Sequence, residues 1–150
     1  MADIVSKAKR SQMMAGIKST NTKLEILIRR ALFARGFRFR IHSKTIPGKP
    51  DLALAKYRAA IFVNGCFWHG HNCHLFKVPA TRTDFWLDKI KCNQERDKVV
   101  SRLLTDEGWR KLVIWECSLR GPGRKSSEAV LDAVSAWIEG SSSSRQIRGK

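Results

Sequence analysis

The period of the hydrophobic positions changes near residue 36, and the change separates two predicted elements. Apolar residues recur every three or four positions in TNTKLEILIRRALFARG (20–36), which predicts a helix. Thr22 and Glu25 stand three apart, as a capping box at the start of that helix requires. FRFRI (37–41) then alternates apolar and basic residues, a pattern typical of a half-buried strand.

The remaining apolar runs predict three more strands and two more helices. After the turn IPGKP, DLALA (51–55) and AAIFV (59–63) indicate two strands, and the nearly all-apolar second one suits the centre of a sheet. A long helix is predicted from about residue 83 to 107, followed by a strand at WRKLVIWE (109–116). A last helix carries the apolar stripe Val130, Val134, Trp137 and Ile138.

This order of elements predicts a single α/β domain with a mixed central sheet flanked by helices. We place the domain at residues 22–139. Residues 1–21 form a basic segment before it, in which KAKRSQMMAGIKS (7–19) is a short helix or an arm that becomes ordered on a partner. The low-complexity, basic tail GSSSSRQIRGK (140–150) is predicted to be disordered.

The charge of the chain narrows the class of partner. Lys and Arg total 29 against 13 Asp and Glu, for a net charge of +16. A small protein this basic attracts polyanions, and counterion release favours nucleic acid. The basic residues are spread along the chain and do not line one amphipathic helix, which argues against a membrane surface. With neither a signal peptide nor a membrane span, we expect a cytoplasmic protein whose cysteines are reduced.

The segment GCFWHGHNCH (65–74) has the spacing of a metal site. Zinc prefers four nitrogen or sulfur ligands in a tetrahedron, and this segment offers three of them within eight residues. The predicted ligands are Cys66, His71, Cys73 and, at the end of a later strand, Cys117. The alternative is that these are free core cysteines and solvated histidines. His74 could replace His71 as a ligand, although its position beside Cys73 would strain the geometry.

Other polar residues are candidates for catalysis. His69 is left over from the zinc set and has the acid/base chemistry that proton transfer needs. Asp51 begins a strand after a proline turn and would face Val63 at the end of the next strand, where a carboxylate could hold Mg²⁺. Glu25 could be a second acid or only a helix cap. His42 is interpreted as a polar surface residue at an edge.

Exposed aromatic residues lie among basic ones in the middle of the chain. Phe67 and Trp68 belong to the metal segment, and Trp86 follows KVPATRTDF, which contains Lys77 and Arg82. Aromatic rings in a basic field can stack on bases or wedge between them. The alternative for the two tryptophans is that they cover the zinc site or pack on the sheet.

Several of these motifs together resemble the very short patch repair (Vsr) DNA mismatch endonucleases of bacteria. The resemblance rests on PGKPDLAL, IFVNGCFWHGHNC, FKVPATRTDFWLDKI and GWRKLVIWEC, with RSQMMAGIKSTNTKLE near the start. It covers about residues 8–138. It implies a fold similar to the restriction-endonuclease core and a Mg²⁺-dependent nick in duplex DNA, 5′ to the thymine of a T:G mismatch left by deaminated 5-methylcytosine.

The resemblance also implies roles for individual residues. Asp51 would hold Mg²⁺ with the main-chain carbonyl of Val63, and His69 would activate water or protonate near the scissile phosphate. Cys66, His71, Cys73 and Cys117 would bind a structural Zn²⁺. Phe67, Trp68 and Trp86 would wedge beside the mismatch from the major groove, while Met13 and Met14 would approach the minor groove.

Two departures from the expected pattern bear on the mechanism. Restriction-type cores usually carry an acidic-x-lysine motif on the strand after the PD motif, and VNG (63–65) has neither residue, so that catalysis must depend on His69. Asn64 stands where some members have histidine, and it cannot transfer protons at neutral pH. The alternatives to a mismatch endonuclease are a restriction enzyme of the same fold and a zinc-stabilised DNA-binding module without catalysis. We expect a monomer that works alongside mismatch-repair proteins and a cytosine-5 methyltransferase at the nucleoid.

Overall fold

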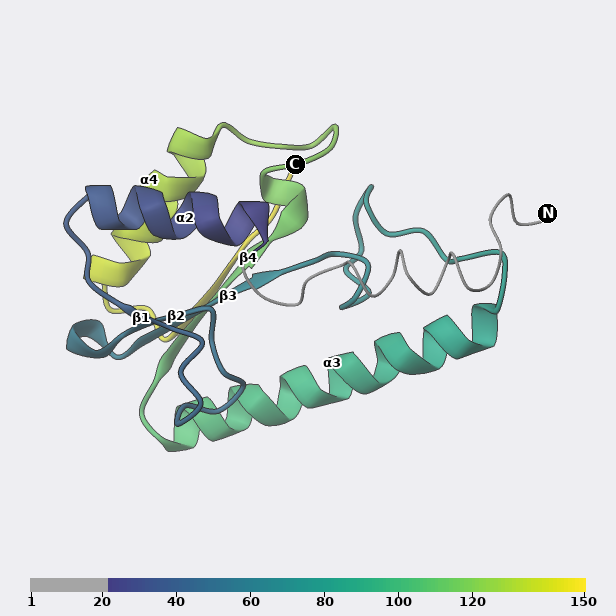
Figure 1. The fold of residues 1–150 in the computed structure, drawn as a ribbon, viewed down its shortest axis with the longest axis horizontal. Helices are drawn as coiled ribbons and strands as arrows, with labels where there is room; N and C mark the ends of the chain where they lie inside the picture. Colours follow the sequence, from purple (N-terminus) through teal and green to yellow (C-terminus); the bar gives the residue numbers. More distant parts are fainter. Residues whose placement is uncertain (1–21) are drawn as a thin grey trace.

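The computed structural model describes residues 22–150 as a five-stranded sheet between two layers of helix (Figure 1). Helices α2 and α4 cover one face and the long helix α3 runs along the other. The strands follow one another across the sheet in sequence order. The elements are α2 (Lys23–Ala34), β1 (Arg40–Ile41), β2 (Leu52–Leu54), β3 (Ala59–Asn64), α3 (Thr83–Asp106), β4 (Arg110–Trp115), α4 (Ser127–Glu139) and β5 (Ser144–Ile147).

The sheet is mixed because its connections are of two kinds. Short turns join β1, β2 and β3, so these strands pair antiparallel. The connections through α3 and α4 are long enough to return the chain to the same end of the sheet, and β3, β4 and β5 therefore pair parallel. These observations confirm the predicted mixed α/β domain.

The main core lies on the face that α2 and α4 cover. Alternate residues of β4, Leu112 and Ile114, point to this face and are fully buried. They pack with Ile28 and Leu32 of α2 and with Val134 of α4 in one hydrophobic cluster. This packing fixes the first turn of α2, which carries Glu25, against the sheet.

The opposite face is packed more lightly. Of the 24 residues of α3, the helix buries only Ile90 and Leu104. The amino-terminal half of α3 extends past the end of the sheet in Figure 1, where it lies beside the loop that follows β3. Val113 and Trp115 of β4 belong to a second, smaller cluster on this side, which also contains Cys66 and Cys117.

Two boundary predictions are corrected by the sheet. The tail at 140–150 was predicted to be disordered, but Ser144–Ile147 form β5 and pair with β4. Ile147 is buried in the main core, so one apolar side chain and a parallel partner strand order a segment that composition alone describes as low-complexity. The strand predicted at 37–41 is restricted to Arg40–Ile41, because the buried Phe37 packs in the core before the pairing begins.

Candidate active site and metal centre

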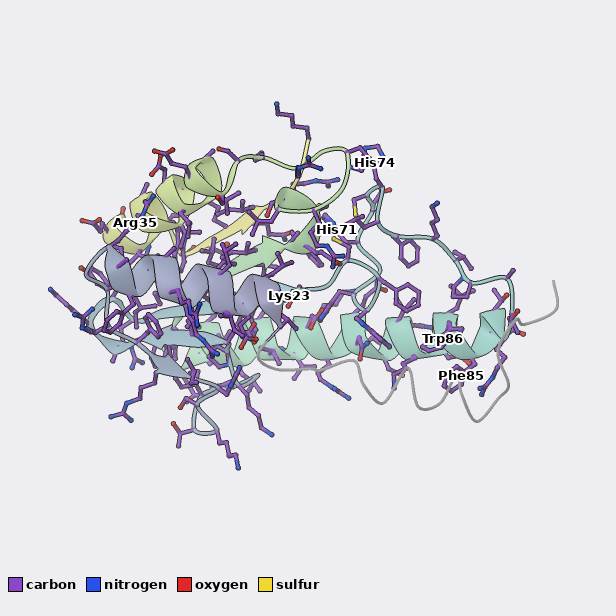
Figure 2. All side chains as sticks on the ribbon, turned by 45° about the horizontal axis from the view of Figure 1, so that its top comes forward. Lys23, Arg35, His71, His74, Phe85 and Trp86 are labelled. Carbon is purple, nitrogen blue, oxygen red and sulfur yellow. The ribbon has the colours of Figure 1, made fainter. Side chains whose placement is uncertain are left out.

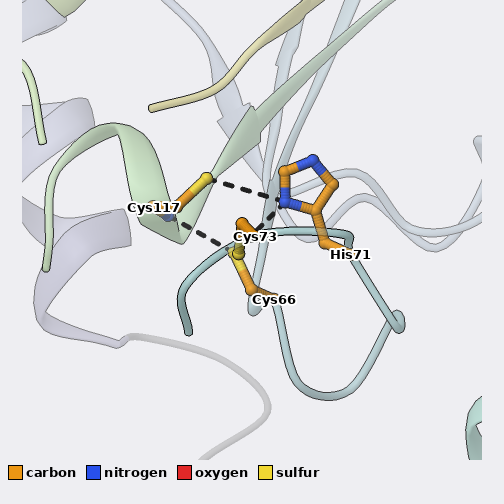
Figure 3. Close-up of side chains that lie close together, drawn as sticks. All are labelled: Cys66, His71, Cys73 and Cys117. Atoms are coloured by element: carbon orange, nitrogen blue, oxygen red, sulfur yellow. Dashed lines mark hydrogen bonds between the residues drawn. The ribbon is translucent and has the colours of Figure 1, made fainter. Parts of the chain in front are cut away.

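The four residues of the predicted zinc set converge at the carboxyl ends of β3 and β4. Cys66 follows β3 and Cys117 follows β4, and the parallel register that pairs Asn64 with Trp115 brings the two segments together. Their sulfur atoms both lie 3.6 Å from Nδ1 of His71 (Figure 3). With Cys73, all four donor atoms lie within 4.8 Å of one another.

The donor set fits a tetrahedral zinc ion. Zinc–sulfur and zinc–nitrogen bonds of about 2.3 and 2.05 Å at a tetrahedral angle separate sulfur from nitrogen by about 3.6 Å, which is the observed spacing. Burial raises the pKa of the Cys66 thiol, and the neighbouring Cys73 and Cys117 thiols raise it further. Burial also lowers the pKa of His71, which favours the neutral imidazole that binds metals. A divalent cation would balance the thiolates that this enclosure otherwise disfavours.

Residues outside the set hold it in place from two sides. The ring of His71 stacks on Trp115 at 4.0 Å and an angle of 5°. The indole N–H of Trp115 donates to Oε1 of Gln146 at 2.8 Å, and the backbone N–H of Gly149 donates to Sγ of Cys117 at 3.3 Å. The carboxyl-terminal segment, which the sequence pattern left out of the domain, therefore supports the cluster: β5 through Gln146 and Trp115, and Gly149 beyond it through Cys117.

A second cluster of metal-binding side chains combines Glu25, His42 and Asp51. The backbone N–H of Val63 donates to Oδ2 of Asp51 at 2.6 Å, which fixes the carboxylate between the start of β2 and the end of β3. The Glu25 carboxylate is 2% exposed and faces it. Burial and the adjacent Glu25 carboxylate raise the pKa of Asp51 to about 8, although the Val63 N–H opposes the shift.

His42 is not the simple surface residue that the sequence suggested. Its Nε2 lies 2.8 Å from Oε2 of Glu25 and 3.8 Å from Oδ1 of Asp51. The side chain is only 22% exposed. No spacing pattern links residues 25, 42 and 51, so this contact could be found only from the tertiary structure.

Both interpretations of Glu25, a helix cap and a second acid, are compatible with its contacts. Its backbone N–H donates to Oγ1 of Thr22 at 3.2 Å, as one half of a capping box does. Its carboxylate faces the Asp51 cluster and also lies 3.7 Å from Arg29. The helix start thus delivers a buried acid to the same place as Asp51.

His69 lies in the loop between β3 and α3 and has an acidic partner. Its Nδ1 is 2.5 Å from Oδ2 of Asp97, a residue of α3 that the sequence pattern did not single out. Neighbouring side chains of α3 anchor the loop: Asn93 donates to the carbonyl of Trp68 at 2.9 Å and Gln94 to that of His69 at 3.1 Å. A charged residue 28 positions away on a helix gives no local signal of such a pairing.

A glycine allows the close approach between this loop and the helix. Gly70 has φ +60°, and a Cβ at this position would lie 2.5 Å from the Gln94 side chain and 2.7 Å from that of Ile90. The loop therefore rests directly on α3, with His69 next to its aspartate.

The aromatic residues form a continuous group beyond the metal centre. The rings of Phe67, Trp68 and Trp86 lie between 5.2 and 5.8 Å apart in edge-to-face contacts. Each of the three is half-buried. Trp86 and its neighbour Phe85 lie in the first turn of α3, at the end that extends beyond the sheet (Figure 2).

The remaining predicted DNA-contacting residues divide into two groups. Lys77 and Arg82 are exposed on the segment before α3, and the Arg82 guanidinium lies 4.3 Å from the ring centroid of Phe85. Met13 and Met14, with the rest of the predicted segment 1–21, lie outside the described residues. Cys92, which had no ligand spacing, is exposed on α3 and belongs to neither of the two metal-binding clusters found in residues 22–150. No described helix has the length and apolar character that a membrane crossing needs.

Comparison with known proteins gives a consistent result. The family model described as DNA mismatch endonuclease Vsr matches residues 2–75. The chain is 46% identical over 147 residues to DNA mismatch endonuclease Vsr of Escherichia coli (strain K12), an alignment that covers 98% of this chain and 94% of that protein. It is also 46% identical over 120 residues to the type II nicking enzyme V.NmeAIP of Neisseria meningitidis serogroup A, covering 80% and 86% of the two chains. Identity to the type II nicking enzyme V.XorIIP of Xanthomonas oryzae pv. oryzae is 42% over 123 residues, covering 82% and 90%.

Proposed function

Because this chain belongs to the DNA mismatch endonuclease Vsr family, we propose that it nicks duplex DNA on the 5′ side of the thymine in a T:G mismatch. The nick would begin the repair of deaminated 5-methylcytosine, and the chromosome in the bacterial cytoplasm would be the substrate. The observation that carries the proposal is the carboxylate pair at the sheet, a buried Glu25 beside a partly buried Asp51, accompanied by a histidine that an aspartate orients. The net charge of +16 supports a polyanionic partner.

The carboxylate cluster fits a divalent cation of the kind that phosphodiester hydrolysis uses. Asp51 would hold Mg²⁺ with the main-chain carbonyl of Val63, and Glu25 would contribute a second acid nearby. When bound, Mg²⁺ stabilises charge on the phosphate and lowers the pKa of a coordinated water. The hydrogen bond from the Val63 N–H holds Oδ2 of Asp51, and the other oxygen, Oδ1, is the one that faces His42.

His69 would move the proton that hydrolysis requires. Because Nδ1 of His69 faces Asp97, its Nε2 is the ring nitrogen left for the substrate. From that position it either takes a proton from the attacking water or gives one near the scissile phosphate, and Asp97 stabilises the charged imidazolium in both cases. Asn64 at the end of β3 has no acid/base chemistry to share this task.

The zinc centre would stiffen the loop that carries both the histidine and the aromatic residues. The loop would be held on one side by an ion bound to Cys66, His71 and Cys73. On the other side it is anchored by hydrogen bonds from Asn93 and Gln94 of α3. Phe67, Trp68 and Trp86 would then wedge beside the mismatch. Unstacking costs least at a mispaired step, so the wedge itself would favour T:G over C:G. The mixed sheet with an acid at the head of β2 supports a restriction-endonuclease-like core.

The decisive experiment uses end-labelled duplexes that differ only in T:G or C:G at one position, incubated with Mg²⁺. We expect a nick in the thymine strand of the T:G duplex alone. Asp51→Asn and His69→Ala should abolish it, whereas His74→Ala, which alters an exposed histidine outside both clusters, should retain it.

Other outcomes would replace the proposal. Cleavage of both strands of matched DNA would indicate a restriction enzyme of the same fold. Salt-sensitive binding without any nick would indicate a DNA-binding module. For the wedge, Trp68→Ala should reduce the preference for T:G, and Phe33→Ala, an exposed ring on α2, is the matched control.

A further inference from the structure

We propose that His42 is itself a metal ligand, and that Glu25, His42 and Asp51 form a mixed nitrogen–oxygen site that holds the catalytic Mg²⁺ but binds a first-row transition ion such as Mn²⁺ more tightly. This inference deepens the proposed function and rests on it, because it concerns the ion that would occupy the proposed catalytic centre. The sequence motifs do not indicate that His42 binds metal, and a site made of carboxylates alone would not need it.

The distances around His42 are short enough for the three side chains to reach one ion. An ion with bonds of about 2.1 Å separates adjacent octahedral ligands by about 3.0 Å and opposite ones by about 4.2 Å. Nε2 of His42 lies 2.8 Å from Glu25 and 3.8 Å from Asp51, and all three donor atoms fall within 4.8 Å of one another.

The donor atoms of the cluster also converge. Oδ2 of Asp51 is held by the Val63 N–H, and its other oxygen, Oδ1, is the one that faces the imidazole. The Glu25 carboxylate is 2% exposed, and the guanidinium of Arg29 lies 3.7 Å from it on the same helix. One imidazole and two carboxylates directed at a shared point are a complete protein contribution to a divalent-ion site, with water for the remaining positions.

The backbone at His42 is arranged to aim the ring inward. His42 directly follows β1 and has φ +48°, a left-handed conformation that few residues other than glycine adopt. This conformation turns the chain at the end of the strand and leaves the side chain 22% exposed beside the carboxylates.

The ligand type determines which ion the site favours. Mg²⁺ prefers oxygen ligands and retains its water shell, whereas first-row transition ions gain affinity from an imidazole nitrogen. Replacing a water by His42 therefore benefits an ion such as Mn²⁺ more than it benefits Mg²⁺. Mn²⁺ is also a selective probe, because the thiolate-rich cluster at Cys66 favours zinc.

The test measures metal binding directly, with zinc-loaded full-length protein and no DNA. Free Mn²⁺ is quantified by its electron paramagnetic resonance signal, Mg²⁺ affinity is obtained by competition, and spin-echo modulation reports a ¹⁴N nucleus bound to Mn²⁺. We expect wild-type protein to show the nitrogen modulation. His42→Ala should lose it and weaken Mn²⁺ binding at least about tenfold, with a smaller change for Mg²⁺.

Two control variants show whether the nitrogen signal comes from His42. His69→Ala should keep the nitrogen modulation, since its ring is paired with Asp97, and Asp51→Asn should lose bound Mn²⁺. His42→Gln provides a second variant that preserves hydrogen bonding if the alanine variant does not fold.

Two results would overturn the inference and identify His42 as an ion-pair partner of Glu25. One is unchanged or tighter Mn²⁺ binding in the His42 variants, and the other is absence of the modulation in wild-type protein. Either result is independent of whether T:G duplexes are nicked, so failure of the proposed function is recognised separately.

Discussion

The two metal-binding clusters differ in how the chain assembles them. The sulfur-rich cluster draws three ligands from one loop of eight residues, Cys66–Cys73, and one from the end of the adjacent strand. The oxygen-rich cluster draws Glu25 from the start of a helix, His42 from the end of β1 and Asp51 from the start of β2. The first depends mainly on local spacing, whereas the second exists only when the helix, the loop and the sheet are packed together.

The clusters also differ in access. Cys66 and Cys117 are at most 3% exposed, and Trp115 and Gly149 contact their cluster from outside. Asp51 and His42 retain side-chain exposures of 15% and 22%. An enclosed site with four protein ligands suits a structural ion, and a partly open one with oxygen ligands suits an ion that meets a substrate. The comparison predicts that removing the first cluster damages the fold and removing the second damages only the reaction.

The largest expected effect is on the fold. Cys117→Ser should lose bound zinc and lower the free energy of unfolding by about 3 kcal/mol or more, because metal-binding free energy contributes to folding. Metal content by mass spectrometry and thermal unfolding measure the two effects. Cys92→Ser, on the exposed face of α3, should change neither. Full zinc occupancy in Cys117→Ser would contradict the tetrahedral assignment.

The next effect should be confined to catalysis. Asp51→Asn should reduce Mg²⁺-dependent nicking by about 10³-fold, since it removes a metal ligand. Without added Mg²⁺ its melting temperature should equal or exceed that of the wild type, because the substitution removes one of two facing, buried carboxylates. A strongly destabilised Asp51→Asn would mean that the second cluster supports the fold as the first one does.

A smaller effect on catalysis is expected from the contact between His69 and Asp97, which joins the loop 65–74 to α3. His69 belongs to the loop 65–74 that carries three residues of the first cluster, and Asp97 holds it from α3. Asp97→Asn should lower kcat by about 10- to 100-fold, part of the contribution of a general acid or base, and leave KM for the duplex unchanged. Partial recovery in Asp97→Glu would support a positioning role. Asp88→Asn, an exposed acid on the same helix, is the control, and an equal loss there would refute the pairing.

The smallest effect is a dependence of metal affinity on pH. The pKa of Asp51 is raised to about 8, so an ion must displace a proton below that pH. The Kd for Mg²⁺ should fall by up to about tenfold per pH unit from pH 6 and level off above pH 8. In the metal-free protein, rising pH has an unfavourable effect instead. The folded state holds a proton on Asp51 that the unfolded state releases, so the free energy of unfolding decreases from about pH 4 to 8. Isothermal titration of the wild-type protein with Mg²⁺ at several pH values checks the first statement. Thermal unfolding of the metal-free wild type beside Asp51→Asn, whose stability should lack this dependence on pH, checks the second.

The sequence predicted most of the fold because the apolar periodicities extend over long segments. The helices at 83–107 and near Val130 correspond to α3 and α4, and the apolar run at 59–63 is the central β3. It missed β5, because SSSSRQI offers a single apolar residue to a core whose position the local pattern cannot reveal. It also grouped the four residues of the first cluster, three by their local spacing and Cys117 because it ends a strand expected beside the one that precedes Cys66.

The charge, the order of elements and the chemistry available in the loop 65–74 can all be read from the amino-acid sequence. Which acids and histidines lie against one another depends on the packing of the folded chain. Asp97 reaches His69, and His42 reaches Glu25, across separations of 28 and 17 residues. Such contacts depend on how α3 and α2 lie against the sheet, and that arrangement results from the burial of many apolar side chains at once. No short stretch of sequence contains that information.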